Sequence, residues 1–296
     1  MGQAYLNSTL TYTDPAEGGL FLRAGAEAAE WASADNVHKY LDATGAWTTP
    51  ELGPSADSLT ALSGWPAIIA ESKRAAKSPD KWASWIGQEA EFTYDSETYH
   101  ARLIDIAHFE RSDGGGTCGF VFEFVELIHA QMNLTATNTG GWPSMKLCKE
   151  DMPGILTKLP ADIQGGIVEV KLKYNTYRGS GSGDSAFNIS DTTGKLFVAS
   201  SREIDGTKYT FGNDGEQLAW YKTHTANTDR QRKVHSSAVI NDSIYGSWWT
   251  RSCDANTTNF RAFATTGENG SSSANARSES ENAGPNVCAT PIFCLG

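Results

Sequence analysis

Residues 248–253 read WWTRSC, residues 259–263 read NFRAF and residues 288–296 read CATPIFCLG. Their aromatic and β-branched residues are typical of strands. Between the last two segments lies a polar run of Gly, Ser, Asn and Glu with scarcely a hydrophobic residue. Polar runs between strands form exposed loops, and loops on a rigid scaffold carry many binding residues. The sequence therefore predicts a terminal loop, held by strands, as the first place to look for function.

The terminal loop and its flanking strands supply the candidate binding residues. Asn and Ser provide adaptable hydrogen bonds, while Arg and aromatic side chains provide anchors, as in recognition loops. Successive strand residues point to opposite faces, so only one of Trp248 and Trp249 is expected to bind a ligand. The candidate ligand-binding residues are Trp249, Arg251, Asn256, Asn259, Arg261, Asn269, Asn275, Arg277 and Asn282. The alternative, a solvated loop with two structural tryptophans, stays open.

Hydrophobic periodicity predicts the upstream elements. Residues 85–94 and 98–107 alternate with period two across a short polar turn, which indicates a β-hairpin. Helical spacing, with Pro66 in the first turn, predicts a helix over 65–77. The remaining predicted strands are 6–12, 120–128, 167–174 and 196–200, the remaining predicted helices are 24–41 and 145–159, and residues 178–184 are predicted to be a flexible excursion.

Several motifs occur in a fixed order along the chain. They are Gly-Trp at 141–142, Leu-Pro-Ala-Asp-Ile at 159–163, Lys-Leu-Phe-Val-Ala-Ser-Ser-Arg-Glu at 195–203, Trp-Trp-x-Arg-Ser at 248–252 and Pro-x-Phe-Cys-Leu at 291–295. In this order they resemble a domain-of-unknown-function family common in phage and prophage structural proteins and bacterial surface proteins. That family is similar to C-type-lectin-like folds, which the variable proteins of diversity-generating retroelements also use. The resemblance begins at about Trp65 and runs to the end.

The resemblance and the turn-rich stretch 48–63 together predict the domain organisation. We expect an N-terminal attachment or adaptor region over residues 1–63, with a simple extension packed on the main domain as the alternative. Residues 64–296 are expected to form an α+β domain with a C-type-lectin-like fold, in which mixed or antiparallel strands, about two helices and long polar loops combine.

Composition limits the classes of partner. The chain has 296 residues with 24 Lys and Arg against 35 Asp and Glu, a net charge of −11. Binding to nucleic acid or to an anionic membrane surface requires a basic face, so neither is expected. No stretch approaches a membrane-spanning length of apolar residues, and the N-terminus lacks the pattern of a secretory signal. We therefore expect a protein made in a host cytoplasm, and the resemblance implies that it is released as part of a virion.

Cofactor and metal chemistry have little support in the sequence. The five cysteines lack metal-site spacing and are expected to be free, mostly buried thiols, with a bridge from Cys253 to Cys288 or Cys294 as the alternative. A lectin-like fold invites calcium, which needs several oxygen ligands. The nearest match to a sugar-binding Glu-Pro-Asn tripeptide is residues 284–286, Gly-Pro-Asn, where the carboxylate is missing. No cofactor is expected, and calcium is the weaker alternative.

One group of residues resembles a catalytic or metal site. His108 lies near Asp105, Glu110 and Asp113 in the sequence. Because these charges surround a predicted strand end and turn, we interpret them as solvated charge rather than as an active site. The sequence therefore predicts no catalytic residues.

The resemblance and the loop chemistry together predict a non-enzymatic phage virion protein. It would be a tail or head fibre, another receptor-binding appendage or a decoration protein, and would recognise a host surface glycan or protein. The N-terminal region would contact other virion proteins, and a homo-oligomer is expected because appendages are symmetric. The alternative is a purely architectural virion protein. A third hypothesis, an enzyme of the formylglycine-generating type, requires a reactive thiol among Cys253, Cys288 and Cys294.

Overall fold

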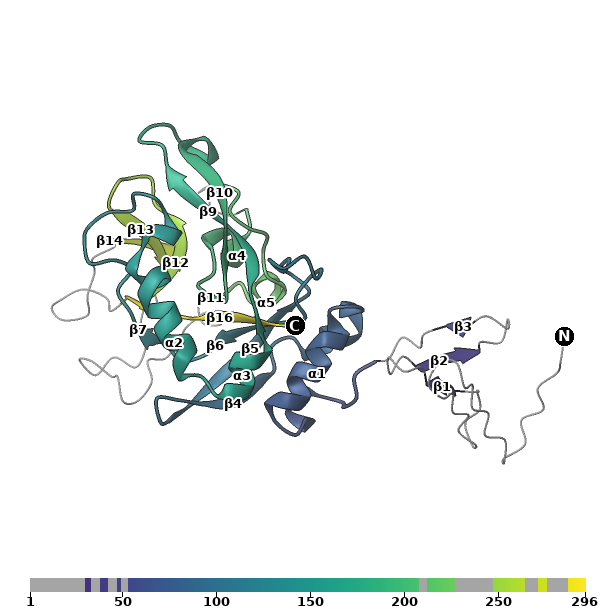
Figure 1. The fold of residues 1–296 in the computed structure, drawn as a ribbon. Coiled ribbons are helices and arrows are strands. Elements are labelled where there is room, and N and C mark those ends of the chain that lie inside the picture. Colours follow the sequence, from purple (N-terminus) through teal and green to yellow (C-terminus); the bar gives the residue numbers. More distant parts are fainter. Residues whose placement is uncertain are drawn as a thin grey trace, which may run out of the picture. The chain divides into compact units, whose positions relative to one another are not determined.

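An antiparallel six-stranded sheet holds the centre of the main unit (Figure 1). Its strands are β4 (Glu89–Tyr94), β5 (Glu97–Ile106), β6 (Phe120–Phe124), β8 (Ile167–Val168), β11 (Leu196–Phe197) and β16 (Ile292–Leu295). The C-terminal strand β16 lies inside this sheet, between β11 and β6, with β8 paired to it as well. All five residues of β6 and all four of β16 are buried. The last strand of the chain is therefore a core element.

A five-stranded sheet is built largely from the terminal segments. Its strands are β7 (Ile128–His129), β12 (Ser247–Cys253), β13 (Asn259–Phe263), β14 (Ser271–Asn275) and β15 (Val287–Ala289), in the order β14-β13-β12-β15-β7. The β12–β15 pair is parallel and the other pairs are antiparallel. Only Thr290 and Pro291 separate β15 from β16, so the chain end joins the two sheets.

A hairpin of β9 (Val170–Tyr177) and β10 (Phe187–Gly194) projects from the main unit in Figure 1. The 3-10 turn η5 (Gly183–Ala186) closes it. The flexible excursion expected over 178–184 is thus the tip of a hairpin. Gly179, Gly181 and Gly183 adopt positive φ angles there, a backbone conformation that glycine enters without steric cost. Strand β10 was missed because its polar residues are largely exposed and show no hydrophobic alternation.

Short helices complete the main unit. They are α1 (Trp65–Ala75), α2 (Met152–Lys158), α3 (Ala161–Gly166), α4 (Ser201–Asp205) and α5 (Ala219–Thr223), with 3-10 turns η1 (Leu59–Ala61), η2 (Pro79–Trp85) and η3 (Trp142–Ser144) and a π-helical turn η4 (Leu147–Asp151). None of the helices in the described residues is long and apolar enough to cross a membrane.

Helix α1 is fixed to the central sheet by one serine. The Ser72 hydroxyl donates to the carbonyl of Leu295 at 3.0 Å and accepts from the amide of Phe120 at 2.7 Å. A Cβ on Gly119 would lie 2.0 Å from the carbonyl oxygen of Ser72, so only glycine allows this approach. Trp65 at the start of α1 packs against Phe122 and Phe293 with ring centroids 5.4 Å and 6.0 Å apart. The helix and the two central strands therefore share one aromatic core.

The computed structural model describes residues 30–32, 38–41, 47–48, 53–207, 212–226, 247–263, 271–275 and 287–296. The chain divides into two units, residues 1–53 and 54–296. Residues 54–63, expected to belong to the N-terminal region, are therefore part of the main unit. The predicted strand 6–12 lies outside the described residues.

The described part of the first unit contains three short strands. They are β1 (Glu30–Ala32), β2 (His38–Leu41) and β3 (Trp47–Thr48), paired in antiparallel order. The helix predicted over 24–41 is therefore wrong for the described residues in this range. Pairing between neighbouring strands overrode the weak helical preference of the Ala- and Glu-rich sequence.

The long, periodic segments of the main unit were predicted well. The helix over 65–77, the hairpin over 85–107 and the buried strand within 120–128 are confirmed. The helix predicted over 145–159 is confirmed as η4 followed by α2, with Pro153 in the first turn of α2. The predicted polar terminal loop also contains a strand, β14, which was missed because its sequence, SSSAN, lacks strand-like residues. The protein is α+β, as expected.

Candidate functional site

The two tryptophans at the start of β12 both lie in the core. Trp248 and Trp249 are buried, and the indole N–H of Trp249 donates to the carbonyl of Ala130 at 3.0 Å. The ring of Trp248 stacks on Phe263 with centroids 4.9 Å apart. Neither tryptophan reaches the surface: Trp249 is hydrogen-bonded to the Ala130 carbonyl, and the ring of Trp248 packs against Phe263 and Tyr221. This corrects the expectation that Trp249 contacts a ligand.

Arg251 is also fully buried, and it is the most highly connected polar side chain of β12. Its guanidinium forms a two-pronged ion pair with Glu203 of α4, in which Nη1 donates to Oε2 at 2.6 Å and Nη2 donates to Oε1. The remaining donors reach three backbone carbonyls, those of Lys173 at 2.8 Å, Val198 at 3.0 Å and Asp214 at 3.1 Å. Arg251 therefore connects β12 to β9, to the residue that follows β11, to α4 and to the 212–218 segment. It is a structural residue, which corrects the expectation that it binds ligand.

Glu203 is equally well satisfied. It closes a capping box at the start of α4, where Ser200 Oγ accepts from the Glu203 amide and Glu203 Oε2 accepts from the Ser200 amide. A Cβ on Gly215 would lie 2.7 Å from Glu203 Cγ, so the 212–218 segment packs directly on this carboxylate. The ion pair is thus tightly enclosed, with both side chains only 1% exposed.

A second carboxyl group lies beside the ion pair. Asp214 is fully buried, and its Oδ2 accepts from the hydroxyl of Ser252 at 2.6 Å. Burial raises the pKa of Asp214 to about 6, against the opposing effects of Arg251 and the Ser252 hydrogen bond. The Arg251 cluster therefore gains negative charge as the pH rises through this value.

The turn between β12 and β13 carries the predicted residues that do reach the surface. Asn256 Oδ1 accepts from the amides of Thr258 at 2.9 Å and Asn259 at 2.7 Å, so this side chain shapes the turn. Asn138, from a distant segment, donates to the carbonyls of Asn256 at 2.6 Å and Asn259 at 2.9 Å. Arg261 lies 3.7 Å from Asp254 and is mostly buried. The structure thus brings Asn256, Asn259 and Arg261 together.

Of the other four predicted binding residues, the structure describes only Asn275. Asn269, Arg277 and Asn282 lie outside the described residues. Asn275 is the last residue of β14, where its Cα pairs with that of Asn259. Asn275 therefore lies on the strand next to β13, opposite the residue at which the β12–β13 turn ends.

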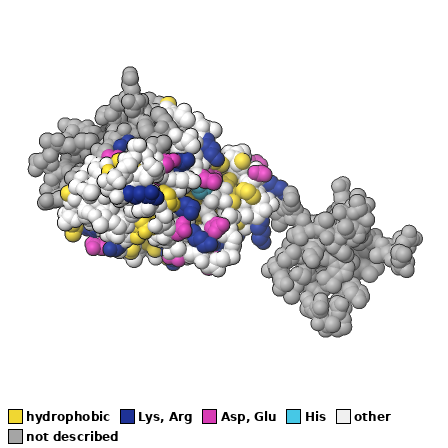
Figure 2. Space-filling view, turned by 90° about the horizontal axis from the view of Figure 1, so that it is seen from above, with side chains coloured by type: hydrophobic (Ala, Val, Ile, Leu, Met, Phe, Trp, Pro, Cys, Tyr) yellow, Lys and Arg dark blue, Asp and Glu magenta, His cyan; other side chains and the backbone are white. Residues whose placement is uncertain are grey.

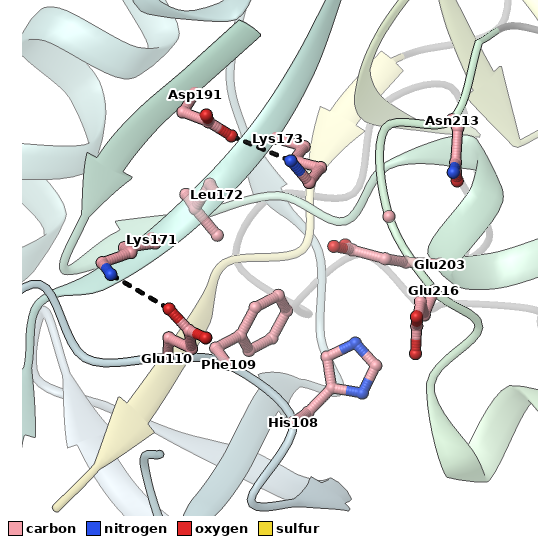
Figure 3. Close-up of a pocket in the computed structure, with 11 residues that line it drawn as sticks. His108, Phe109, Glu110, Lys171, Leu172, Lys173, Asp191, Glu203, Asn213 and Glu216 are labelled. Carbon is pink, nitrogen blue, oxygen red and sulfur yellow. Dashed lines mark hydrogen bonds and ion pairs between the residues drawn. The ribbon is translucent and has the colours of Figure 1, made fainter. Parts of the chain in front are cut away.

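A separate cavity of about 570 Å³ opens on the other side of Glu203 (Figure 3). The described residues that line the cavity belong to the segment after β5, to β9 and β10, to α4 and to the 212–218 segment. The lining residues are His108, Phe109, Glu110, Lys171, Leu172, Lys173, Asp191, Glu203, Asn213, Gly215 and Glu216. Lys171 pairs with Glu110 at 3.0 Å and Lys173 pairs with Asp191 at 3.1 Å.

A strained backbone directs His108 into this cavity. Strand β5 has a register shift between Leu103 and Asp105, and Ala107 has a φ of 56°, an unusual conformation for a residue with a side chain. Asp105 Oδ2 lies 2.8 Å from His108 Nδ1, and Asp105 also accepts from the amides of Ile106 and Ala219. The contact with Asp105 orients the imidazole so that Nε2 faces the cavity.

The pairing of Asp105 and His108 corrects the reading of these residues as solvated charge. Their side chains are only 11% and 13% exposed. Burial lowers the pKa of His108, but the hydrogen bond and charge of Asp105, aided by Glu203, outweigh it and leave the pKa raised. Sequence spacing placed the two residues near each other, but the bulge that turns the histidine inward left no sequence signal.

The cysteines are free and mostly buried, as predicted. Burial raises the pKa of Cys288 to about 12 and raises the pKa values of Cys253 and Cys294. A hydrogen bond from Cys294, rather than exposure, lowers the pKa of Cys118, which is fully buried. Within the described residues no group of three or more His, Cys, Asp or Glu side chains is placed to hold a metal ion.

The described residues on one face of the main unit form no large patch of a single charge. Figure 2 shows basic and acidic side chains interspersed over one face of the main unit rather than gathered in a patch of one sign. Recognition on this face would therefore depend on local arrangements of side chains rather than on a long-range field.

Comparison with known proteins identifies one family. A family model described as Domain of unknown function (DUF6273) matches residues 26–295. No curated protein and no solved structure matches the chain. The matched range contains both the β12–β13 turn and the His108 cavity.

The buried ion pair leads to a prediction about the free energy of unfolding. Arg251→Met should lower the free energy of unfolding by about 3–5 kcal/mol, because it leaves the Glu203 carboxylate buried without its partner. Adding Glu203→Gln should recover part of this loss, since Gln keeps the helix cap without the charge. Urea unfolding of the single and double variants measures both effects. Lys173→Met, which removes an exposed ion pair, should cost about 0–1 kcal/mol, and an equal cost for Arg251→Met would contradict the assignment.

The raised pKa of Asp214 predicts a pH dependence. Because the folded-state pKa of about 6 exceeds the usual aspartate pKa of 3.8, the folded protein binds one more proton than the unfolded chain between these pH values. Asp214 therefore contributes most stability at low pH, and this contribution is lost as the pH rises towards 6. Asp214→Asn should gain stability relative to the wild type by roughly 1–3 kcal/mol between pH 4 and pH 7. Denaturant unfolding across this range tests the sign, and a constant difference would refute it.

Proposed function

The chain belongs to the family described as Domain of unknown function (DUF6273), and we propose that it is a non-enzymatic binding protein of a phage virion. In this role it is a tail or head fibre, or another receptor-binding appendage, that recognises a host surface glycan or protein through its C-terminal loops. The ordered motifs from residue 141 to residue 295 support the virion assignment by resemblance. The α+β architecture is compatible with a C-type-lectin-like domain.

The turn between β12 and β13, which hydrogen bonds hold in one conformation, is the observation that supports this proposal most strongly. Asn138 and Asn256 together hold the turn through backbone amides and carbonyls, so its shape does not depend on a ligand. Ala255 and Thr257 are exposed at its tip. A loop whose conformation is fixed in advance loses less conformational entropy on binding, and therefore binds more tightly for the same contacts. Binding residues that rigid elements support keep a more precise geometry, and here a polar turn is held on a buried strand.

Thiol chemistry is the less favoured alternative. An enzyme of the formylglycine-generating type needs an accessible thiolate, whereas Cys253, Cys288 and Cys294 are buried and their pKa values are raised. In the architectural alternative the loops contact other virion proteins, so the same β12–β13 turn would bind a different partner. The N-terminal unit is the proposed attachment to other virion proteins. A homo-oligomer would strengthen weak single-site recognition through multivalency.

Substitution at the tip of the turn tests the proposed surface. Purified protein should bind saturably to whole bacterial cells of a susceptible host, and Ala255→Arg should weaken this binding at least tenfold, because a long charged side chain enters the contact. The tenfold change corresponds to about 1.4 kcal/mol. Dissociation constants measured by flow cytometry with labelled protein provide the comparison.

Ala161→Arg is the matched control, since Ala161 is also exposed but lies at the start of α3. It should leave binding unchanged, and both variants should unfold at the wild-type temperature. Equal binding by the Ala255→Arg variant would remove the turn from the recognition surface. Absence of saturable binding by the folded wild type to any cell tested would favour the architectural role.

A further inference from the structure

One side of the His108 cavity carries two lysine–carboxylate ion pairs, and the other side carries two glutamates. In Figure 3, β9 presents Lys171 and Lys173 on one side, while Glu203 and Glu216 lie on the other. Lys171 and Lys173 are two residues apart in a strand and therefore share a face. The cavity therefore has both of its lysines on one side, each in an ion pair, and further carboxylates on the other side.

The ammonium groups of the basic wall are available to a ligand. Lys171 and Lys173 are 54% and 55% exposed, and their partners Glu110 and Asp191 are 69% and 77% exposed. Exposed ion pairs of this kind are worth only about 0–1 kcal/mol. A ligand carboxylate can therefore replace Glu110 and Asp191 as the partner at little cost.

The acidic side offers one carboxylate that no described residue pairs with. Glu203 is neutralised by Arg251 behind it. Glu216 is exposed, and among the described residues it has no ion-pair partner. The backbone around it is fixed, because Leu218 donates its amide to the Glu203 carbonyl at 2.8 Å and Gln217 donates to the Ile204 carbonyl at 2.9 Å. Glu216 thus places a negative charge, which no described residue pairs with, on a fixed backbone segment of the same cavity that the two lysines line.

The base of the cavity is partly apolar and carries one oriented polar group. The rings of His108 and Phe109 lie edge to face with centroids 4.6 Å apart. The His108 side chain is held by Asp105 through Nδ1, which leaves Nε2 to meet a ligand. A cavity of about 570 Å³ falls within the size range of small-molecule sites.

We propose that this cavity binds a small zwitterion, an amino acid or a short peptide, with its ammonium group at Glu216 and its carboxylate at Lys171 and Lys173. A simple anion would be attracted by the lysines but repelled by Glu216. A simple cation would be attracted by Glu216 but repelled by the lysines. A ligand with both charges, separated along its length, satisfies both walls at once. This site is independent of the β12–β13 turn and adds a small-molecule function to the proposed surface recognition.

Titration with dipeptides tests the proposal on the full-length protein. Glycylglycine and alanylalanine should bind saturably, as measured by calorimetry and by the shift of the His108 ring resonances in NMR spectra. N-acetylglycylglycine, which lacks the ammonium group, and glycylglycinamide, which lacks the carboxylate, should each bind at least tenfold more weakly. Equal binding of either blocked peptide, or no saturable shift with any probe, would overturn the proposal.

Variants that remove a charged side chain test which side of the cavity binds each charged group of the ligand. Glu216→Gln and the double variant Lys171→Gln/Lys173→Gln should each weaken dipeptide binding at least tenfold, while Glu97→Gln, at an exposed position in β5, should not. Glu216→Gln should lose its discrimination against the acetylated peptide, a readout that a folding defect would not produce. Undiminished dipeptide binding by both cavity variants would overturn the assignment. Cell binding through the β12–β13 turn should be unaffected by Glu216→Gln.

Discussion

The structure depends on the ion pair between Arg251 and Glu203. Transferring both charges from water costs several kcal/mol per ion, and this cost is offset only when the geometry is good and the remaining donors are satisfied. Here the guanidinium reaches one carboxylate and three backbone carbonyls, contributed by β9, the strand end after β11 and the 212–218 segment. These segments cannot move apart without exposing unsatisfied donors. The pair therefore links the five-stranded sheet to the rest of the main unit.

Both candidate surfaces are built on this link. Arg251 lies in β12, directly before the Asp254–Asn259 turn, and Glu203 lines the His108 cavity. The turn is fixed by the strand beneath it and by Asn138. The cavity wall that carries Glu216 is fixed because the 212–218 backbone packs on Glu203. One buried interaction thus supports a polar turn suited to a macromolecular surface and a cavity suited to a small molecule.

Local sequence patterns predicted the elements that depend on local chemistry. Pro66 and an apolar stripe defined α1, and period-two alternation defined the β4–β5 hairpin. The burial of Arg251 could not be predicted, since its partner lies 48 residues away and Arg beside a polar loop is ordinarily a surface residue. The role of His108 was missed for a similar reason. A bulge and a positive φ at Ala107 turn the ring inward, and neither has a sequence signal in the absence of glycine.

Native-state amide hydrogen exchange tests this dependence on the buried ion pair most directly. The amide of Arg251 donates to the Ala199 carbonyl at 2.9 Å and that of Cys253 donates to Asn175 Oδ1 at 2.6 Å. If the ion pair joins the sheets, both amides exchange only on global unfolding, with the same opening free energy as amides in β6. Exchange of Arg251 and Cys253 through a lower-energy opening, while β6 stays protected, would show that the terminal sheet opens independently and would contradict the account.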